Sequence, residues 1–352
     1  MSDISIRTEG RAGRITLDRP KALNALTYEM CLAIEEALLG WLEDNTVSLV
    51  ILDGAGDKAF CAGGDIAEMY ATGTKGDYEY GRRFWRDEYR LNALIADYPK
   101  PVVSLLHGFT MGGGVGVGCH GSHRVVCESS QISMPECSIG LVPDVGGSYL
   151  LARAPGRLGE YLGLTAARMG PADAILAGFA DVFVPRDRWD AVTAALIETG
   201  DTDALAAAAE APPEGTLAVE RPEIDALFGG ETLRDVLNAL KASDTEFARS
   251  AEKALSRNAP LSMAVALETI HRLRAGTPTI RKALDLEYRF THRAMEHGDF
   301  LEGIRARIID KDQSPSWRHA ADKVPMTDTA RLLQPVREAS LAFHDLTQET
   351  PS

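Results

Sequence analysis

HGFTMGGGVGVGCHGSHRVVCESSQISMPECSIGLVPDVGGSY, residues 107–149, is the stretch that decides how this chain folds. It contains three consecutive glycines at 112–114 and two carboxylates, Glu136 and Asp144. Glycine lets a backbone pass close to another group, because it has no Cβ and tolerates positive φ. If a helix begins near Val115, the glycine amides lie at its N-terminus, where unpaired N–H groups and the helix dipole favour a negative oxygen. The stretch therefore predicts a turn that binds a developing oxyanion near two carboxylates.

Apolar segments around this stretch predict a buried parallel sheet. Residues 48–53 and 101–108 are short, nearly all-apolar runs, as expected of strands covered on both faces. Residues 131–134 predict a further strand. Pro135 then ends the pairing because it has no N–H to donate, so Glu136 is expected in a loop at a strand end.

The N-terminal third predicts a sheet edge and two helices. Residues 4–7 and 14–17 alternate apolar and polar side chains, which indicates a β-hairpin. Thr27 is a plausible N-cap for a helix that ends near residue 41. Residues 78–98 have helical periodicity and many charges, and a single acid such as Glu88 in this pattern is more often a solvated, salt-bridged residue.

The chain changes character near residue 186. Residues 1–186 combine strands and helices, whereas residues 187–352 contain amphipathic helical patterns and no predicted strand. No internal repeat indicates a solenoid. We therefore expect an α/β core over residues 1–186 and a helical C-terminal region over residues 187–352.

Composition excludes several functional classes. The formal charge of −14 argues against a general nucleic-acid binder, although a local basic pocket for a phosphorylated ligand is compatible with it. No apolar run is long enough to span a bilayer, so we expect no membrane partner. The cysteines are odd in number and form no CxxC pair, which predicts reduced thiols and a cytoplasmic protein. They are Cys31, Cys61, Cys119, Cys127 and Cys137.

Other hydrolytic and metal chemistries lack their motifs. There is no GxSxG elbow, and the glycine cluster lacks the lysine that a P-loop needs. His107, His120 and His123 are not accompanied by an HExxH pattern, so structural roles and no metal site are expected.

The loop around Glu136 is the strongest candidate for chemistry. Its neighbours are mostly apolar, so an unpaired carboxylate there would be desolvated and could act as a base or nucleophile near neutral pH. The alternative is a surface loop that carries two ordinary acids, Glu136 and Asp144. Two further glycine turns, at 63–64 and 112–114, favour the functional interpretation.

Two motifs carry a family resemblance. FCAGGD at 60–65 and HGFTMGGG at 107–114 resemble the oxyanion-hole signatures of the crotonase (enoyl-CoA hydratase/isomerase) superfamily. Within it, the 134–147 segment resembles the 3-hydroxyisobutyryl-CoA hydrolases, as do residues 87–89 and DKDQSPSW at 310–317. The resemblance covers nearly the whole chain. It implies a crotonase-like spiral of ββα units followed by a helical C-terminal region.

The resemblance also implies a role for each site residue. The amides of Gly64 and Gly113 would polarise a thioester carbonyl. Glu136 would be the catalytic carboxylate, either attacking the acyl carbon or activating water. Asp144 would hold the substrate's 3-hydroxyl or the hydrolytic water, and Glu88 would complete the acyl pocket.

One departure from the superfamily pattern, together with Glu88 and residues 310–317, favours one activity over the others. Hydratases and dienoyl-CoA isomerases carry an acid where Gly116 stands here, and glycine cannot transfer a proton. The resemblance therefore implies hydrolysis of a short branched β-hydroxyacyl-CoA, specifically 3-hydroxyisobutyryl-CoA from valine breakdown, without a cofactor. Hydration or dienoyl isomerisation of a related acyl-CoA is the alternative, and a non-catalytic CoA-binding protein is a third interpretation.

The remaining expectations concern the CoA moiety and assembly. Lys21 and Lys58 occupy positions that could contact CoA phosphates in the superfamily pattern, and a solvated surface role is equally compatible with both. Relatives of this kind are often trimers or hexamers, so a homo-oligomer is one expectation, while the helical tail could replace such contacts.

Overall fold

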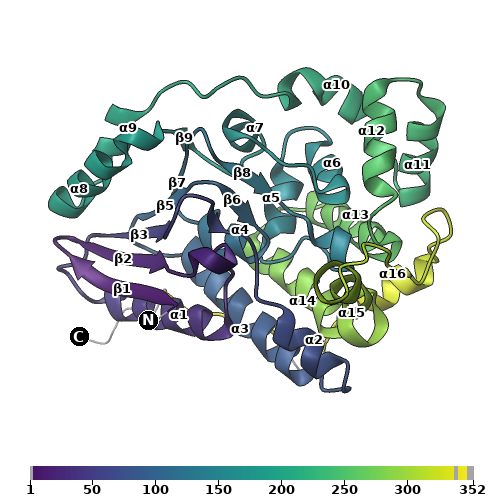
Figure 1. Cartoon of the computed structure of the whole chain (residues 1–352), viewed down its shortest axis with the longest axis horizontal. Coiled ribbons are helices and arrows are strands. Elements are labelled where there is room, and N and C mark those ends of the chain that lie inside the picture. The colour runs from purple at the N-terminus through teal and green to yellow at the C-terminus, as the bar shows by residue number, and fades with distance from the viewer. Residues whose placement is uncertain (1–2, 337–339, 347–352) are drawn as a thin grey trace.

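Two β-sheets form the centre of the molecule. The computed structural model describes residues 3–336 and 340–346 (Figure 1). The larger sheet has the strand order β1-β2-β3-β5-β7-β9 and the smaller β4-β6-β8. The strands are β1 Ile4–Glu9, β2 Ala12–Leu17, β3 Leu49–Gly54, β4 Ala59–Cys61, β5 Val102–Leu106, β6 Phe109–Met111, β7 His123–Val126, β8 Gln131–Ser133 and β9 Val182–Phe183.

Successive strands alternate between the two sheets. The chain passes from β3 to β4, from β5 to β6 and from β7 to β8, each time leaving the larger sheet for the smaller one. Both sheets are parallel in these segments. β4, β6 and β8 are therefore neighbours whose carboxyl ends meet at one edge, where ligands bind in α/β folds. The turns that follow Cys61, Met111 and Ser133 lie at this edge.

Most elements of the N-terminal part follow the sequence pattern. β1 and β2 form the expected antiparallel hairpin, with β1 at the sheet edge. Thr27 caps α1 (Tyr28–Leu42) by accepting a hydrogen bond from the amide of Met30. The other helical segments of this part are η1 Pro20–Ala22, α2 Ala67–Gly73, α3 Glu79–Ala96, α4 Gly113–Gly118, η2 Glu136–Ile139, α5 Gly147–Arg153, α6 Leu158–Thr165 and α7 Pro171–Leu176.

In the described part of the chain, all elements that follow β9 are helical. They are η3 Arg186–Arg188, α8 Trp189–Thr199, α9 Asp203–Ala208, α10 Leu217–Leu227, α11 Leu233–Ala242, α12 Glu246–Leu255, α13 Pro260–Arg274, α14 Ile280–His297, α15 Phe300–Ile304, the π-helical turn η4 Arg305–Ile309 and α16 Met326–Leu332. The sequence pattern did not predict α10, because Pro222 lies inside it. None of the helices among residues 3–336 and 340–346 is long and apolar enough to cross a membrane.

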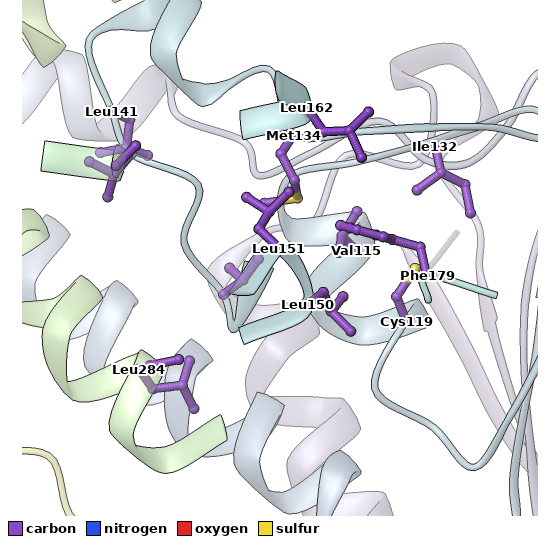
Figure 2. Close-up of a cluster of buried hydrophobic side chains, with 14 of the residues drawn as sticks. Val115, Cys119, Ile132, Met134, Leu141, Leu150, Leu151, Leu162, Phe179 and Leu284 are labelled. Atoms are coloured by element: carbon purple, nitrogen blue, oxygen red, sulfur yellow. The ribbon is translucent and has the colours of Figure 1, made fainter. Parts of the chain in front are cut away.

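Two apolar cores cover the larger sheet on both faces, as predicted for β3. Leu49 and Ile51 belong to a cluster with Trp189 of α8, while Val50 and Leu52 belong to the main cluster. The main cluster joins residues from both sides of position 186, because it includes Leu284 of α14 as well as side chains from α4, α5 and α6, all labelled in Figure 2. The division into two units at residue 186 remains a prediction.

Candidate active site

The turns after β4 and β6 bring two glycines together. A Cβ placed on Gly113 would lie 3.2 Å from the amide nitrogen of Gly64. It would also lie 3.0 Å from Oε1 of Glu88. Gly113 is the first residue of α4, so its amide has no acceptor within that helix. The amide of Gly64 and the carboxyl group of Glu88 therefore both lie close to Gly113, and a joint role for the Gly64 and Gly113 amides remains a prediction.

Backbone contacts fix the Gly64 turn. Leu26 donates from its amide to the carbonyl of Gly63 at 2.9 Å and accepts from the amide of Asp65 at 2.8 Å. These bonds bracket Gly64, whose own amide has no hydrogen-bond acceptor among the described residues. Gly63 has a φ of +125°, a value that a residue with a Cβ rarely adopts. The turn is thus held in a conformation that needs glycine.

Glu136 reaches the same place from β8. It opens the turn η2 directly after Pro135, and a Cβ on Gly112 would lie 2.9 Å from its Oε1. The side chain is only 4% exposed, and Oε2 has no hydrogen-bond partner in the described part of the chain. Burial raises the pKa of Glu136 well above its usual value, and the nearby Asp144 and Glu287 raise it further. This is the desolvated carboxylate that the apolar loop predicted.

Asp144 is buried and hydrogen-bonded to one phenol. It accepts a 2.6 Å bond from the hydroxyl of Tyr89. Burial raises the pKa of Asp144 to about 7, although the Tyr89 bond favours the ionised form and lowers the pKa. The pKa of Tyr89 is raised well above 10 by burial, so Tyr89 keeps its proton and remains the donor. The charge of Asp144 is one cause of the raised pKa of Glu136, so ionisation of one carboxyl group opposes ionisation of the other.

Glu88 is not a solvated surface residue, so the interpretation from helix charge alone was wrong. It is 3% exposed, and its Oε1 has no partner among residues 3–336 and 340–346. Burial, followed by the negative charge of Asp144, raises its pKa well above the usual value. Phe84, Trp85 and Tyr89 lie on the same buried face of α3. The helical spacing of these aromatic residues around Glu88 indicates that Glu88 lies on the buried face of α3. The number of charged residues in the helix does not indicate this.

Glu287 on α14 is a site residue that sequence reasoning missed. It is 1% exposed and accepts hydrogen bonds from the amides of Gly146 at 2.8 Å and Ser148 at 3.0 Å. The hydroxyl of Ser148 also donates to it. Burial raises the pKa of Glu287 to about 8. These bonds hold the turn that directly follows Asp144, in which Val145 has a φ of +53° despite its branched Cβ.

Gly116 has no room for a side chain. A Cβ at this position would lie 2.7 Å from Cβ of Val145 and 2.8 Å from Nδ2 of Asn92. Real Cβ atoms do not approach other heavy atoms so closely. A side chain at position 116 would therefore require both Val145 and Asn92 to move.

The two candidate CoA-binding lysines lie on adjoining surface turns. Lys21 in η1 and Lys58 before β4 are both exposed, and neither forms an ion pair with another described residue. Asn24 links their turns, because its side-chain amide donates to the carbonyls of Ala55 at 3.0 Å and Ala59 at 2.8 Å. Both lysines are therefore available to an anion near the Gly64 turn.

The three histidines of the central stretch lie outside this cluster of acids. Nε2 of His120 bonds the carbonyl of Val145 at 2.8 Å, and burial lowers the pKa of His120 to about 4. His107 stacks edge-on against Trp189, and His123 bonds Ser122. Among the described residues no three His, Cys, Asp or Glu side chains are arranged to hold a metal ion. All five cysteines are buried and free.

A hollow of about 460 Å³ between α11, α13 and α16 is lined by none of these acids or glycines. Its lining includes Leu233, Leu267 and Met326 together with ordinary surface charges. We locate the active site from the convergence of carboxylates and amides, since a hollow without such groups offers no chemistry.

Comparison with known proteins shows the family of this chain. Residues 12–333 match the family model described as Enoyl-CoA hydratase/isomerase. This chain belongs to that family. Curated relatives include proteins named 3-hydroxyisobutyryl-CoA hydrolase, mitochondrial. The one from Gallus gallus is 36% identical over 91% of this chain and 85% of its own length. The one from Xenopus laevis is 40% identical over 88% of this chain and 82% of its own length.

Solved structures of the family confirm the crotonase-like fold. An enoyl-CoA hydratase from Rhodobacter sphaeroides 2.4.1 is 57% identical, covers 97% of this chain and 100% of its own, and superposes with a TM-score of 0.93. A carnitinyl-CoA dehydratase from Mycobacterium thermoresistibile is 43% identical over 97% of this chain and 99% of its own, also with a TM-score of 0.93. The expected family and fold class are thus both confirmed.

Proposed function

We propose that this protein hydrolyses 3-hydroxyisobutyryl-CoA, or another short branched β-hydroxyacyl-CoA, to the free acid and CoA. The observation that carries the proposal is the position of Glu136, whose Oε1 lies within 2.9 Å of the Cβ position of Gly112, next to Gly113. A reactive carboxylate beside two convergent amides is what acyl transfer requires. The names of the curated relatives support the same reaction.

The thioester carbonyl binds between the amides of Gly64 and Gly113 in this proposal. Its oxygen gains negative charge when the acyl carbon becomes tetrahedral. Both amides are already fixed in place, Gly113 by α4 and Gly64 by its bracketing bonds to Leu26, so no reorganisation is needed. Loss of one such donor typically costs about 3–4 kcal/mol of transition-state stabilisation.

Glu136 supplies the nucleophilic step in one of two ways. Its ionised carboxylate attacks the acyl carbon, the C–S bond breaks, and water then hydrolyses the mixed anhydride. Alternatively, the carboxylate removes a proton from a water molecule that attacks the same carbon. In both routes CoA leaves as a thiolate that takes up a proton. Both routes need Glu136 without its proton, so activity should rise with pH through its raised pKa.

Asp144 and Glu88 are proposed to select and orient the acyl group. Asp144 accepts a hydrogen bond from the substrate's 3-hydroxyl or from the hydrolytic water, while Tyr89 holds its other oxygen. Glu88 is buried beside Gly113 with a raised pKa, so it is suited to act as a neutral hydrogen-bond donor in the acyl pocket. Lys21 and Lys58 are proposed contacts for the CoA phosphates.

Hydration is the second candidate, because the 57% identical structure is titled an enoyl-CoA hydratase. Syn addition of water across a double bond uses two acids in the family pattern, and the space for the first of them is filled here by Val145 and Asn92. A non-catalytic CoA-binding role is the third candidate. The buried, unpartnered oxygens of Glu88 and Glu136 speak against it, since such groups cost stability unless function retains them.

The setting of the reaction is also part of the proposal. We infer a role in valine breakdown from the names of the curated relatives. We also propose a cytoplasmic location, because five free, buried cysteines fit a reducing compartment. The word mitochondrial in the vertebrate relatives' names applies to those proteins. A homo-oligomer remains a proposal that sedimentation analysis of the purified protein would test.

The decisive experiment measures free thiol released from 3-hydroxyisobutyryl-CoA, with the enoyl absorbance of crotonyl-CoA followed in parallel. Thiol release without loss of enoyl absorbance supports the hydrolase. Enoyl loss without thiol release would replace it with a hydratase. A thermal shift with CoA but no turnover of either substrate would leave a CoA-binding protein.

A further inference from the structure

Asn92 is a buried amide with no hydrogen-bond partner. It is completely inaccessible to solvent, and neither Oδ1 nor Nδ2 has a partner in residues 3–336 and 340–346. A primary amide has two donors and an acceptor with two lone pairs, and leaving them unpaired in an interior costs about 1–3 kcal/mol. Such a residue needs a reason other than stability.

The position of Asn92 points toward the acyl site. It follows Glu88 by four residues on α3, so both side chains emerge on the same face of that helix. Glu88 faces Gly113 and Asn92 faces Gly116, which lie three residues apart on one face of α4. Because Gly113 and Gly116 have no Cβ atom, both polar groups can approach α4 closely at these positions.

Asn92 also adjoins the turn that carries Asp144. The Cβ position of Gly116 lies 2.8 Å from Nδ2 of Asn92 and 2.7 Å from Cβ of Val145, the residue after Asp144. Nδ2 therefore occupies the space where the family pattern puts a proton-transferring acid. The amide cannot transfer that proton, but it can donate to and accept from a hydroxyl group.

We propose that Asn92 is a substrate-specificity residue that binds a hydroxyl group in the acyl pocket, beside Glu88 and Asp144. This inference rests on the proposed thioester hydrolysis. The hydroxyl is either the 3-hydroxyl of the acyl group or the hydrolytic water. The same amide serves both, because each offers one donor and one acceptor.

Asn92→Leu is the informative variant. Leucine has nearly the same shape, so it removes unpaired polar atoms without opening a cavity. We expect an unchanged or higher melting temperature and a fall of about tenfold in kcat/KM, the effect of one lost hydrogen bond. A loss confined to 3-hydroxyisobutyryl-CoA assigns the 3-hydroxyl, and an equal loss on isobutyryl-CoA assigns the water. Unchanged kcat/KM on both substrates would overturn the inference.

A matched control separates this role from ordinary packing. Asn258 is also buried, but its Nδ2 donates to the carbonyl of Leu164 at 2.7 Å. Asn258→Leu should show the opposite pattern, with a lower melting temperature and unchanged kcat/KM below that temperature. If Asn92→Leu behaved like this control, Asn92 would be structural. Asn92→Ala replaces the leucine variant if the latter fails to fold.

Failure of the proposed hydrolysis is distinguishable from failure of this inference. If the wild-type protein releases no thiol, the function is wrong whatever Asn92 does. Calorimetric titration with the inert thioether S-(3-hydroxy-2-methylpropyl)-CoA then tests Asn92 without turnover. Asn92→Leu should weaken its binding about tenfold relative to S-(2-methylpropyl)-CoA, and equal binding of both would overturn the contact.

Discussion

The hydroxyl of Tyr89 donates a 2.6 Å hydrogen bond to Oδ2 of Asp144, 55 residues further along the chain. Both groups are buried. This bond is the direct link between α3, which carries Glu88, and the loop that carries Asp144. The bond also lowers the pKa of Asp144 and so partly opposes the larger effect of burial, which raises it.

Tyr89→Phe should move the pH dependence of activity upward. Burial raises the pKa of Asp144 to about 7, and the Tyr89 bond lowers it, so deleting the hydroxyl raises the pKa further. Less Asp144 is then ionised at pH 7. We expect kcat/KM at pH 7 to fall about tenfold and its rise with pH to begin later. A pH–rate profile measures this, and an unmoved midpoint would show that Asp144 ionisation does not limit the reaction.

Glu136→Gln should abolish thiol release and largely preserve CoA binding. Glutamine has nearly the same shape but can neither attack the acyl carbon nor remove a proton. Calorimetric titration with CoA should give a Kd close to that of the wild-type protein. Retained turnover would remove Glu136 from the mechanism, and lost CoA binding would make the variant uninformative about chemistry, so both measurements are needed on one preparation.

Asp144→Asn should discriminate between acyl groups. A contact with the 3-hydroxyl predicts a larger loss of kcat/KM for 3-hydroxyisobutyryl-CoA than for isobutyryl-CoA, about tenfold or more. The pKa of Glu136 should also fall, because Asp144 is one of the charges that raise it. The remaining activity should therefore reach its plateau at lower pH. Equal losses on the two substrates would contradict the hydroxyl contact.

Local signals were enough to predict the glycine turns and the Glu136 loop of the candidate site. Glycine runs, strand ends and the proline before Glu136 are features of neighbouring residues, and the parallel order of β4, β6 and β8 then brings these turns to one edge. The family resemblance supplied the roles of Gly64, Gly113 and Glu136, which the structure brings together but does not test.

The supporting residues could not be predicted in this way. Glu287 bonds an amide 141 residues earlier in the chain, and nothing near Glu287 in sequence indicates that contact. The burial of Asn92 and Glu88 was not predicted, because the many charged residues of their helix suggested a solvated surface. Periodicity gives the buried face of a helix, but only the packing of α3 against α4 shows that polar groups on that face meet glycines.

Glu287→Gln should loosen the turn after Asp144. Glutamine keeps one acceptor oxygen, but its NH2 group would face the amide of either Gly146 or Ser148, which needs an acceptor. We expect a loss of about 2 kcal/mol in stability and a fall of about tenfold in kcat/KM. Glu160, buried and paired with Arg157 and Arg274, is the control, because Glu160→Gln should cost stability without changing kcat/KM. Full activity in Glu287→Gln would make Glu287 purely structural.

Gly116→Ala tests why this chain lacks the second acid. The added methyl group would lie 2.7 Å from Val145 and 2.8 Å from Asn92, so both must move. Overpacking of this kind costs about 1–3 kcal/mol, and the displaced Val145 should carry Asp144 with it and reduce kcat/KM. Gly40→Ala is the matched control within α1, where an added Cβ meets nothing within 4 Å, and it should be neutral or stabilising by up to about 1 kcal/mol. If Gly116→Ala were as stable and active as Gly40→Ala, Val145 and Asn92 would yield to a Cβ at position 116, and the close contacts there would no longer argue against a hydratase.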